Sequence, residues 1–224
     1  MLCPVRTQAM PDLMGADCEA DVRVPAPGRI AAPVGILARL RVETRKAHLD
    51  VEQALGFADD SLDHAAYVRR MVRFYGFYQP LELALSKYAR MQPFGELLAD
   101  RLQKTRHLVT DLRALDVCSA SVPLCRELPP LRSPADMLGC LYVIEGATLG
   151  GRVIGPLLQA RLGIDAAGGG RFFAGYGDAT GAMWQALRHV LVVQATDLRT
   201  ENIMIASANA TFLALRLWCE ENQR

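Results

Sequence analysis

Apolar residues recur every three or four positions along most of the chain, which is the spacing of an α-helix with one buried face. The stretch that begins after Gly35 follows this spacing, and Gly56 then offers a helix stop. We find no sustained alternation of apolar and polar residues, the pattern typical of a half-buried strand. The pattern therefore predicts an all-α fold, with helices at about 37–55, 61–80, 94–115, 135–162, 181–197 and 201–221.

Proline and glycine residues separate the predicted helices. Ser133 followed by Pro134 is a typical helix start, with a capping residue and then proline at the first helical position. Pro80 is expected to kink or end the second helix. Three consecutive glycines, 168–170, predict a turn after the long fourth helix.

The first 33 residues differ from the rest of the chain. They contain several prolines and glycines and no helical period, and they lack the basic start and apolar stretch of a secretory signal. The chain as a whole is 51% hydrophobic, enough for one sizeable core. We expect a flexible N-terminal extension, 1–33, and a single multi-helix domain, 34–224.

Charge and cysteine usage limit the possible partners. The net charge is +1, whereas dedicated nucleic-acid and membrane-surface binders usually carry a marked basic patch. The apolar runs are shorter than the roughly 20 residues that span a bilayer. No C-x-x-C motif or zinc-ligand spacing is found, and Cys140 and Cys219 fall in apolar helical patterns. We expect a soluble, cytoplasmic protein that binds neither nucleic acid nor membranes.

Three residues of the first predicted helix share one face. At about 100° per residue, Arg41 lies roughly 20° and Glu52 roughly 40° from the direction of His48. This face could hold a metal bound to a flat anionic ligand, with Glu52 accepting the second ring N–H of His48. A lone histidine in an apolar stripe is, however, more often a structural residue. The remaining histidines, His64, His107 and His189, are expected at exposed or boundary positions.

Five glycines fall inside the predicted helix 135–162: Gly139, Gly146, Gly150, Gly151 and Gly155. Each costs about 0.5–1 kcal/mol relative to alanine in a helix interior. Tight helix packing could explain one or two of them, and the charges of Glu145 and Arg152 argue against a membrane dimer face. We expect the pair Gly150–Gly151 to mark a kink where the backbone lies against a bulky planar ligand.

Two segments resemble a known family. The stretch 40–52 resembles the proximal helix of haem oxygenases, and 145–154 resembles their distal helix. The sequence of residues 142–151 is most similar to that of the bacterial branch of the family, whose members are often paired with bacteriophytochromes. The resemblance implies a helical bundle in which haem is held between a proximal helix and a glycine-kinked distal helix.

The resemblance also implies roles for individual residues. His48 would be the iron ligand with Glu52 as its hydrogen-bond partner, and the distal face would be formed by the catalytic glycines Gly146, Gly150 and Gly151. The remaining haem contacts would be Arg41, Arg45 and Arg188 at the propionates and Phe212 in the pocket wall. Ala147 stands where mammalian members carry an aspartate that organises distal water. Water held by backbone carbonyls of the kinked helix is a reasonable substitute.

The activity implied is oxidative cleavage of haem, which is both cofactor and substrate. O2 and electrons from a reductase or a ferredoxin-type donor would yield biliverdin, Fe2+ and CO, and the biliverdin could supply a bacteriophytochrome. A haem carrier or sensor without turnover remains an alternative. A di-iron oxidase would need Glu-x-x-His spacing, which is absent, and a thiaminase-like hydrolase would need a placed cysteine nucleophile.

Overall fold

The computed structural model describes residues 35–91 and 94–220, and the expected extension 1–33 lies outside these residues. Within this part of the chain there are helices and no strand, which confirms the predicted all-α fold. The α-helices are α1 (Ile36–Glu43), α2 (Arg45–Leu55), α3 (His64–Ser86), α4 (Phe94–Ala99), α5 (Lys104–Ala114), α6 (Pro134–Leu162), α7 (Arg171–Ala174), α8 (Thr180–Gln194) and α9 (Leu198–Glu220). Short 3-10 turns are η1 (Lys87–Arg90), η2 (Ser119–Ser121) and η3 (Gly177–Ala179).

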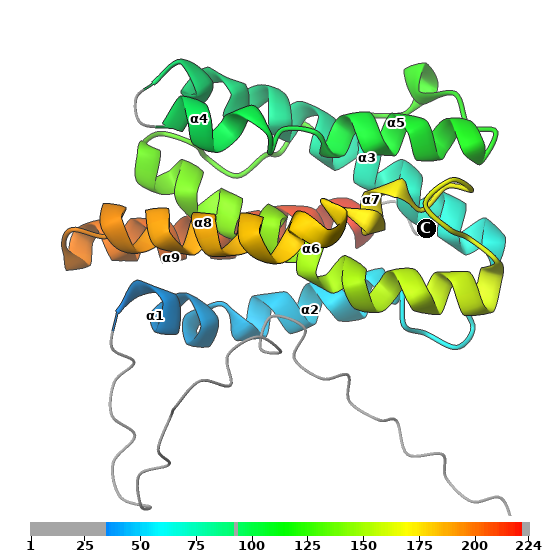
Figure 1. Ribbon diagram of the computed structural model, residues 1–224, viewed down its shortest axis with the longest axis horizontal. Helices are drawn as coiled ribbons and strands as arrows, with labels where there is room; N and C mark the ends of the chain where they lie inside the picture. The colour runs from blue at the N-terminus through cyan, green and yellow to red at the C-terminus, as the bar shows by residue number, and fades with distance from the viewer. Residues whose placement is uncertain (1–34, 92–93, 221–224) are drawn as a thin grey trace, which may run out of the picture.

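The helices form layers around α6 and α9 (Figure 1). These two helices make the most extensive helix–helix contact of the bundle. Helices α3, α4 and α5 lie along one side of them, and α1 and α2 lie along the other. Helix α2 packs on α9 and α3 packs on α5. Elements from both halves of the sequence therefore pack on one another in the bundle.

Helix α6 begins where the sequence predicts. The Ser133 hydroxyl accepts the backbone N–H of Asp136 at 3.2 Å, and the Asp136 carboxylate accepts the N–H of Ser133 at 2.8 Å. This reciprocal capping box, with Pro134 at the first position, fixes the start. By length and composition α6 could span a bilayer, but 72% of its most apolar window is buried. Helix α6 is thus the core helix of the bundle, and it changes direction partway along its length (Figure 1).

The predicted first helix is divided in two by Thr44. Its buried hydroxyl donates to the carbonyl of Leu40 at 2.7 Å, a contact that bends helices. The backbone bonds from Thr44 N–H to Leu40 and from His48 N–H to Thr44 persist, at 3.1 and 3.0 Å. Helices α1 and α2 therefore follow one another closely, but Arg41 and His48 belong to separate helices.

The predicted helix 94–115 is also wrong, because residues 100–103 separate α4 from α5. The buried carboxylate of Glu82, on α3, accepts the backbone N–H groups of Lys104 and Thr105 at 2.8 and 3.0 Å. This long-range cap starts a new helix at Lys104. Pro80 does not end the second helix, since α3 continues to Ser86.

Aromatic rings join α3, α7 and the loop after α2. Phe57, Phe74 and Phe173 meet at ring-centroid distances of 5.0–6.4 Å. Phe172 packs on Phe74 and Tyr78 at 5.1 and 5.2 Å. This cluster fixes the position of the very short helix α7 against the core.

The two cysteines expected in apolar helical patterns are indeed buried. Burial raises the pKa of the Cys140 and Cys219 thiols to about 12. Neither thiol therefore forms the thiolate that a cysteine nucleophile requires.

Candidate functional site

A cavity of about 90 Å³ lies between α2 and α6. Helices α3, α7 and α9 complete its wall. The lining residues are His48, Val51, Glu52, Leu55, Phe57, Phe74, Tyr78, Val143, Gly146, Ala147, Gly150, Ile154, Phe172, Phe173, Phe212 and Leu215. Most of this wall is aliphatic or aromatic, so it favours an apolar ligand with few polar groups.

His48 lies on the α2 side of the cavity and is held from two directions. Its Nε2 atom faces the Oε1 atom of Glu52, one helical turn later, at 3.5 Å. The ring of Phe212, on α9, meets the imidazole edge to face with centroids 5.5 Å apart. A carboxylate beside one ring nitrogen and an aromatic ring against the imidazole orient the side chain, which is what a metal-ligating histidine requires. His48 and Glu52, which their spacing places on one helix face, therefore lie next to each other in the structure.

The α6 side of the cavity is formed partly by bare backbone. Gly146 and Gly150 are one turn apart, and both are buried residues of the lining. Ala147, between them, adds only a methyl group. A flat ligand could therefore lie close to this helix without meeting a large side chain.

Two of the other glycines in α6 have packing roles. A Cβ atom on Gly139 would collide with the Met204 carbonyl of α9, and one on Gly151 would collide with the Phe173 carbonyl of α7. Gly151 lines a separate groove and is not part of the cavity between α2 and α6. Gly151 was expected on the ligand face of α6, but in the structure it faces α7. Its hydrogen atom allows α6 and α7 to approach closely.

The donor set fits a metal that brings its own ligands. Within the described ranges 35–91 and 94–220, no group of three or more His, Cys, Asp or Glu side chains could hold a metal ion. A single oriented imidazole beside an apolar cavity suits haem, in which the porphyrin supplies four nitrogens and the protein adds one axial ligand. The backbone surface at Gly146 and Gly150 suits a flat macrocycle on the opposite side.

The three arginines proposed for the haem propionates lie outside the cavity wall. Arg41 is exposed in the last turn of α1, and Arg45 is the exposed first residue of α2, three residues before His48. Arg188 is half-exposed on α8, where it donates to the Gln185 side chain at 3.2 Å. The role of all three remains a prediction.

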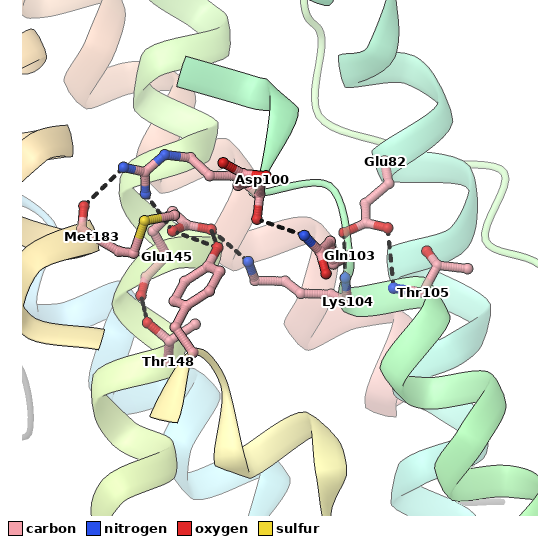
Figure 2. A network of polar contacts seen from close by, with 10 residues as sticks. Glu82, Asp100, Gln103, Lys104, Thr105, Glu145, Thr148 and Met183 are labelled. Carbon is pink, nitrogen blue, oxygen red and sulfur yellow. Dashed lines mark hydrogen bonds and ion pairs between the residues drawn. The ribbon is translucent and has the colours of Figure 1, made fainter. Parts of the chain in front are cut away.

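A buried ionic network lies beside α6, and the sequence reasoning did not find it (Figure 2). Glu145 is 1% exposed, and its carboxylate accepts bonds from Arg101 at 2.7 Å, Lys104 at 2.5 Å and the Tyr176 hydroxyl at 2.9 Å. Arg101 also donates to the Met183 carbonyl of α8 at 2.8 Å. A carboxylate in the middle of the apolar run 137–151 was the available signal, because such a group is rarely buried without partners.

The tyrosine of this network stays protonated in the interior. Burial and the neighbouring Glu145 carboxylate raise the pKa of Tyr176, so its hydroxyl remains a donor. Removing one partner of a buried ion pair typically costs about 3–5 kcal/mol because a charge is left uncompensated. The network therefore joins the start of α5, the middle of α6 and the segment before α8 as one unit.

Comparisons with known proteins show the family and the fold of the chain. The family model described as heme oxygenase matches residues 35–221. The fold is similar to that in the crystal structures of the NO- and CO-bound heme oxygenase from Neisseria meningitidis, with a TM-score of 0.69 and 18% sequence identity. That similarity covers 84% of this chain and 92% of the other. No curated protein matches the chain.

Proposed function

The chain belongs to the haem oxygenase family of haem-degrading oxidoreductases, and we propose that it binds haem between α2 and α6 with His48 as the iron ligand. One observation carries the proposal. The cavity has an oriented imidazole on its α2 side and the bare backbone of Gly146 and Gly150 on its α6 side. This is the arrangement expected for a flat, metal-containing ligand with one protein ligand and a narrow space on its other face.

Each part of the cavity has a separate task in this proposal. When bound, haem would supply the iron at which O2 is reduced. Glu52 holds the imidazole of His48 in one orientation and increases its basicity. The bare backbone at Gly146 and Gly150 would leave room for O2 beside the bound haem. The aromatic rings of Phe74 and Phe172 exclude bulk water from the macrocycle.

We further propose the reactants and products of the reaction, the propionate contacts and the fate of the product. Haem, O2 and electrons from an external reductase or a ferredoxin-type donor would give biliverdin, Fe2+ and CO. Arg41 lies in the last turn of α1 and Arg45 at the start of α2, and both are exposed, which supports their contact with propionates at the protein surface. Arg188 would be a third contact. The sequence of residues 142–151 resembles the branch paired with bacteriophytochromes, which supports delivery of biliverdin to such a protein in the cytoplasm.

A hemin titration tests the assignment of the ligand. Purified protein should form a stoichiometric complex with the absorption spectrum of a histidine-ligated haem. His48→Ala should lose this spectrum, because no other imidazole lines the described cavity. His189→Ala is the matched control, since His189 is exposed on α8 and lies outside the cavity. An unchanged spectrum in His48→Ala would contradict the proposal.

A further inference from the structure

The solvent-facing side of α9 carries apolar residues along most of its length. Ala206, Leu213 and Leu217 are exposed, the two leucines by 47% and 43%, and Ile203 and Ala210 are half-exposed. These five residues form the seam of α9. They are separated by three, four, three and four positions and fall within an arc of about 80°. This is the a/d spacing of a helix that packs along a second helix, on a side where a surface helix normally carries polar residues.

The seam is separate from the faces of α9 that hold the bundle together. Met204 and Ser207 meet the backbone of Gly139, on α6. Phe212, which packs on His48 and lines the central cavity, points about 140° away from the middle of the seam. A partner on the seam therefore approaches a different face of α9 from the one that forms the cavity wall.

A groove of about 670 Å³ lies beside the seam, between α9 and the loop before α6. The Cys125 N–H of this loop donates to a backbone carbonyl of α3 at 2.8 Å, and the Trp218 indole N–H of α9 donates to another at 2.9 Å. Leu124, also on the loop, is 42% exposed and extends the apolar surface. Both walls of the groove are thus fixed to the same helix, so little conformational freedom is lost when a partner binds.

We propose that the seam binds the seam of a second copy of this chain, with the two α9 helices antiparallel across a two-fold axis. Leu217 then lies over Ala206 of the partner subunit, and Leu213 lies over Ala210 of the partner subunit. Both pairs fit one register, because the two leucines and the two alanines are each four positions apart. A large side chain faces a small one in every layer, which fills a helix–helix interface well. The same pairs recur on the other side of the axis, as a two-fold interface requires.

The charges at the two ends of α9 favour the same orientation. Arg199 lies four positions before the seam and Glu220 three positions after it, so both continue its spacing, and both are exposed. In the antiparallel register, Glu220 lies within one helical turn of Arg199 of the partner subunit. A parallel pair would instead place like charges together and each seam residue against its own copy, with alanines facing alanines. Charge and shape therefore both select an antiparallel second copy.

Sedimentation of the full-length protein tests the proposal, and it needs no haem. The wild type should form a dimer at micromolar concentration. Leu213→Glu should raise the dissociation constant of the dimer at least about 100-fold, because the two-fold axis buries the new carboxylate twice without a partner. Leu83→Glu is the matched control, since Leu83 is 69% exposed on α3, and this variant should remain a dimer. If Leu213→Glu does not fold, Ala206→Glu at the exposed alanine of the seam decides.

An exchange of the end charges tests the orientation. Arg199→Glu and Glu220→Arg should each raise the dissociation constant about 3–10-fold, because each opposes like charges at two symmetric positions. The double variant should return it close to the wild-type value. A wild-type chain that stays monomeric at micromolar concentration would overturn the proposal, whatever else covers the seam, and so would a dimer that Leu213→Glu leaves intact. A double variant as weak as the single variants would overturn the antiparallel register.

Discussion

The imidazole of His48 and the ring of Phe212 meet edge to face at 5.5 Å, although 164 positions separate them in the sequence. Helix α9 carries Phe212 and packs along α2, so the contact depends on the whole bundle. Together with the nearby Glu52 carboxylate, this contact leaves the His48 side chain little rotational freedom. His48, the proposed iron ligand, is therefore oriented both by a residue of its own helix and by a residue of a distant helix.

Replacing the carboxylate partner of His48 should weaken haem binding. In Glu52→Gln, the amide is a poorer acceptor for an imidazole N–H, so the orientation and basicity of His48 both suffer. We expect the Kd for hemin to rise about 10–100-fold, the usual effect of removing such a partner. Hemin titration followed by absorption measures it. Gln53→Glu, a change at the adjacent exposed position, should leave the Kd near that of wild type.

A side chain on the glycine side of the cavity should block ligand entry. Gly150→Leu would place a butyl group in the cavity lining and should reduce hemin binding strongly while the protein remains helical by circular dichroism. Gly181→Leu is the matched control, because a Cβ atom there has no neighbour within 4 Å. Equal hemin affinity in the two variants would remove the explanation given for Gly150.

Gly139 should be important for stability. A Cβ atom at this position would collide with the Met204 carbonyl, which belongs to the backbone of α9 and cannot move easily. We expect Gly139→Ala to lower the free energy of unfolding by about 1–3 kcal/mol, the usual cost of overpacking. Gly181→Ala, in open space, should instead raise it by up to about 1 kcal/mol. Chemical denaturation of both variants shows whether the signs differ.

The buried carboxylate of Asp111 should give stability a pH dependence. Asp111 accepts the N–H groups of Arg171 and Phe172 at 2.7 and 2.8 Å, yet burial raises its pKa to about 6. The unfolded chain loses this proton near pH 4, so the contribution of Asp111 to stability is largest below about pH 4 and falls as pH rises through 6.

Comparison with Asp111→Asn isolates this contribution. The free energy of unfolding of wild type minus that of the variant should be about 1–3 kcal/mol larger at pH 4.5 than at pH 7.5. Urea denaturation at the two pH values measures the difference. A difference that is the same at both values would show that Asp111 is not the titrating group.

The features that local sequence determines were predicted well. The Ser133–Pro134 start of α6 depends on bonds within four residues, and the spacing of His48 and Glu52 depends on one helical turn. The positions of both could therefore be read from the pattern. The haem-binding roles of His48 and Glu52 remain predictions.

The features that depend on distant residues were missed. The break before Lys104 requires the Glu82 carboxylate from another helix, and the partners of Glu145 come from α5 and the segment before α8. The resemblance implied that Gly151 lines the ligand face together with Gly146 and Gly150, but only the latter two line the cavity. Gly151 points in another direction and meets α7. No local pattern reveals which helix covers which face.

Turnover of the hemin complex distinguishes haem degradation from haem storage. Hemin-loaded protein is mixed with ascorbate in air, and the absorption spectrum is followed over time. We expect loss of the Soret band together with growth of a broad red absorption from biliverdin, so that the solution turns green. A Soret band that persists unchanged would contradict it and would identify the protein as a carrier or sensor that holds haem without degrading it.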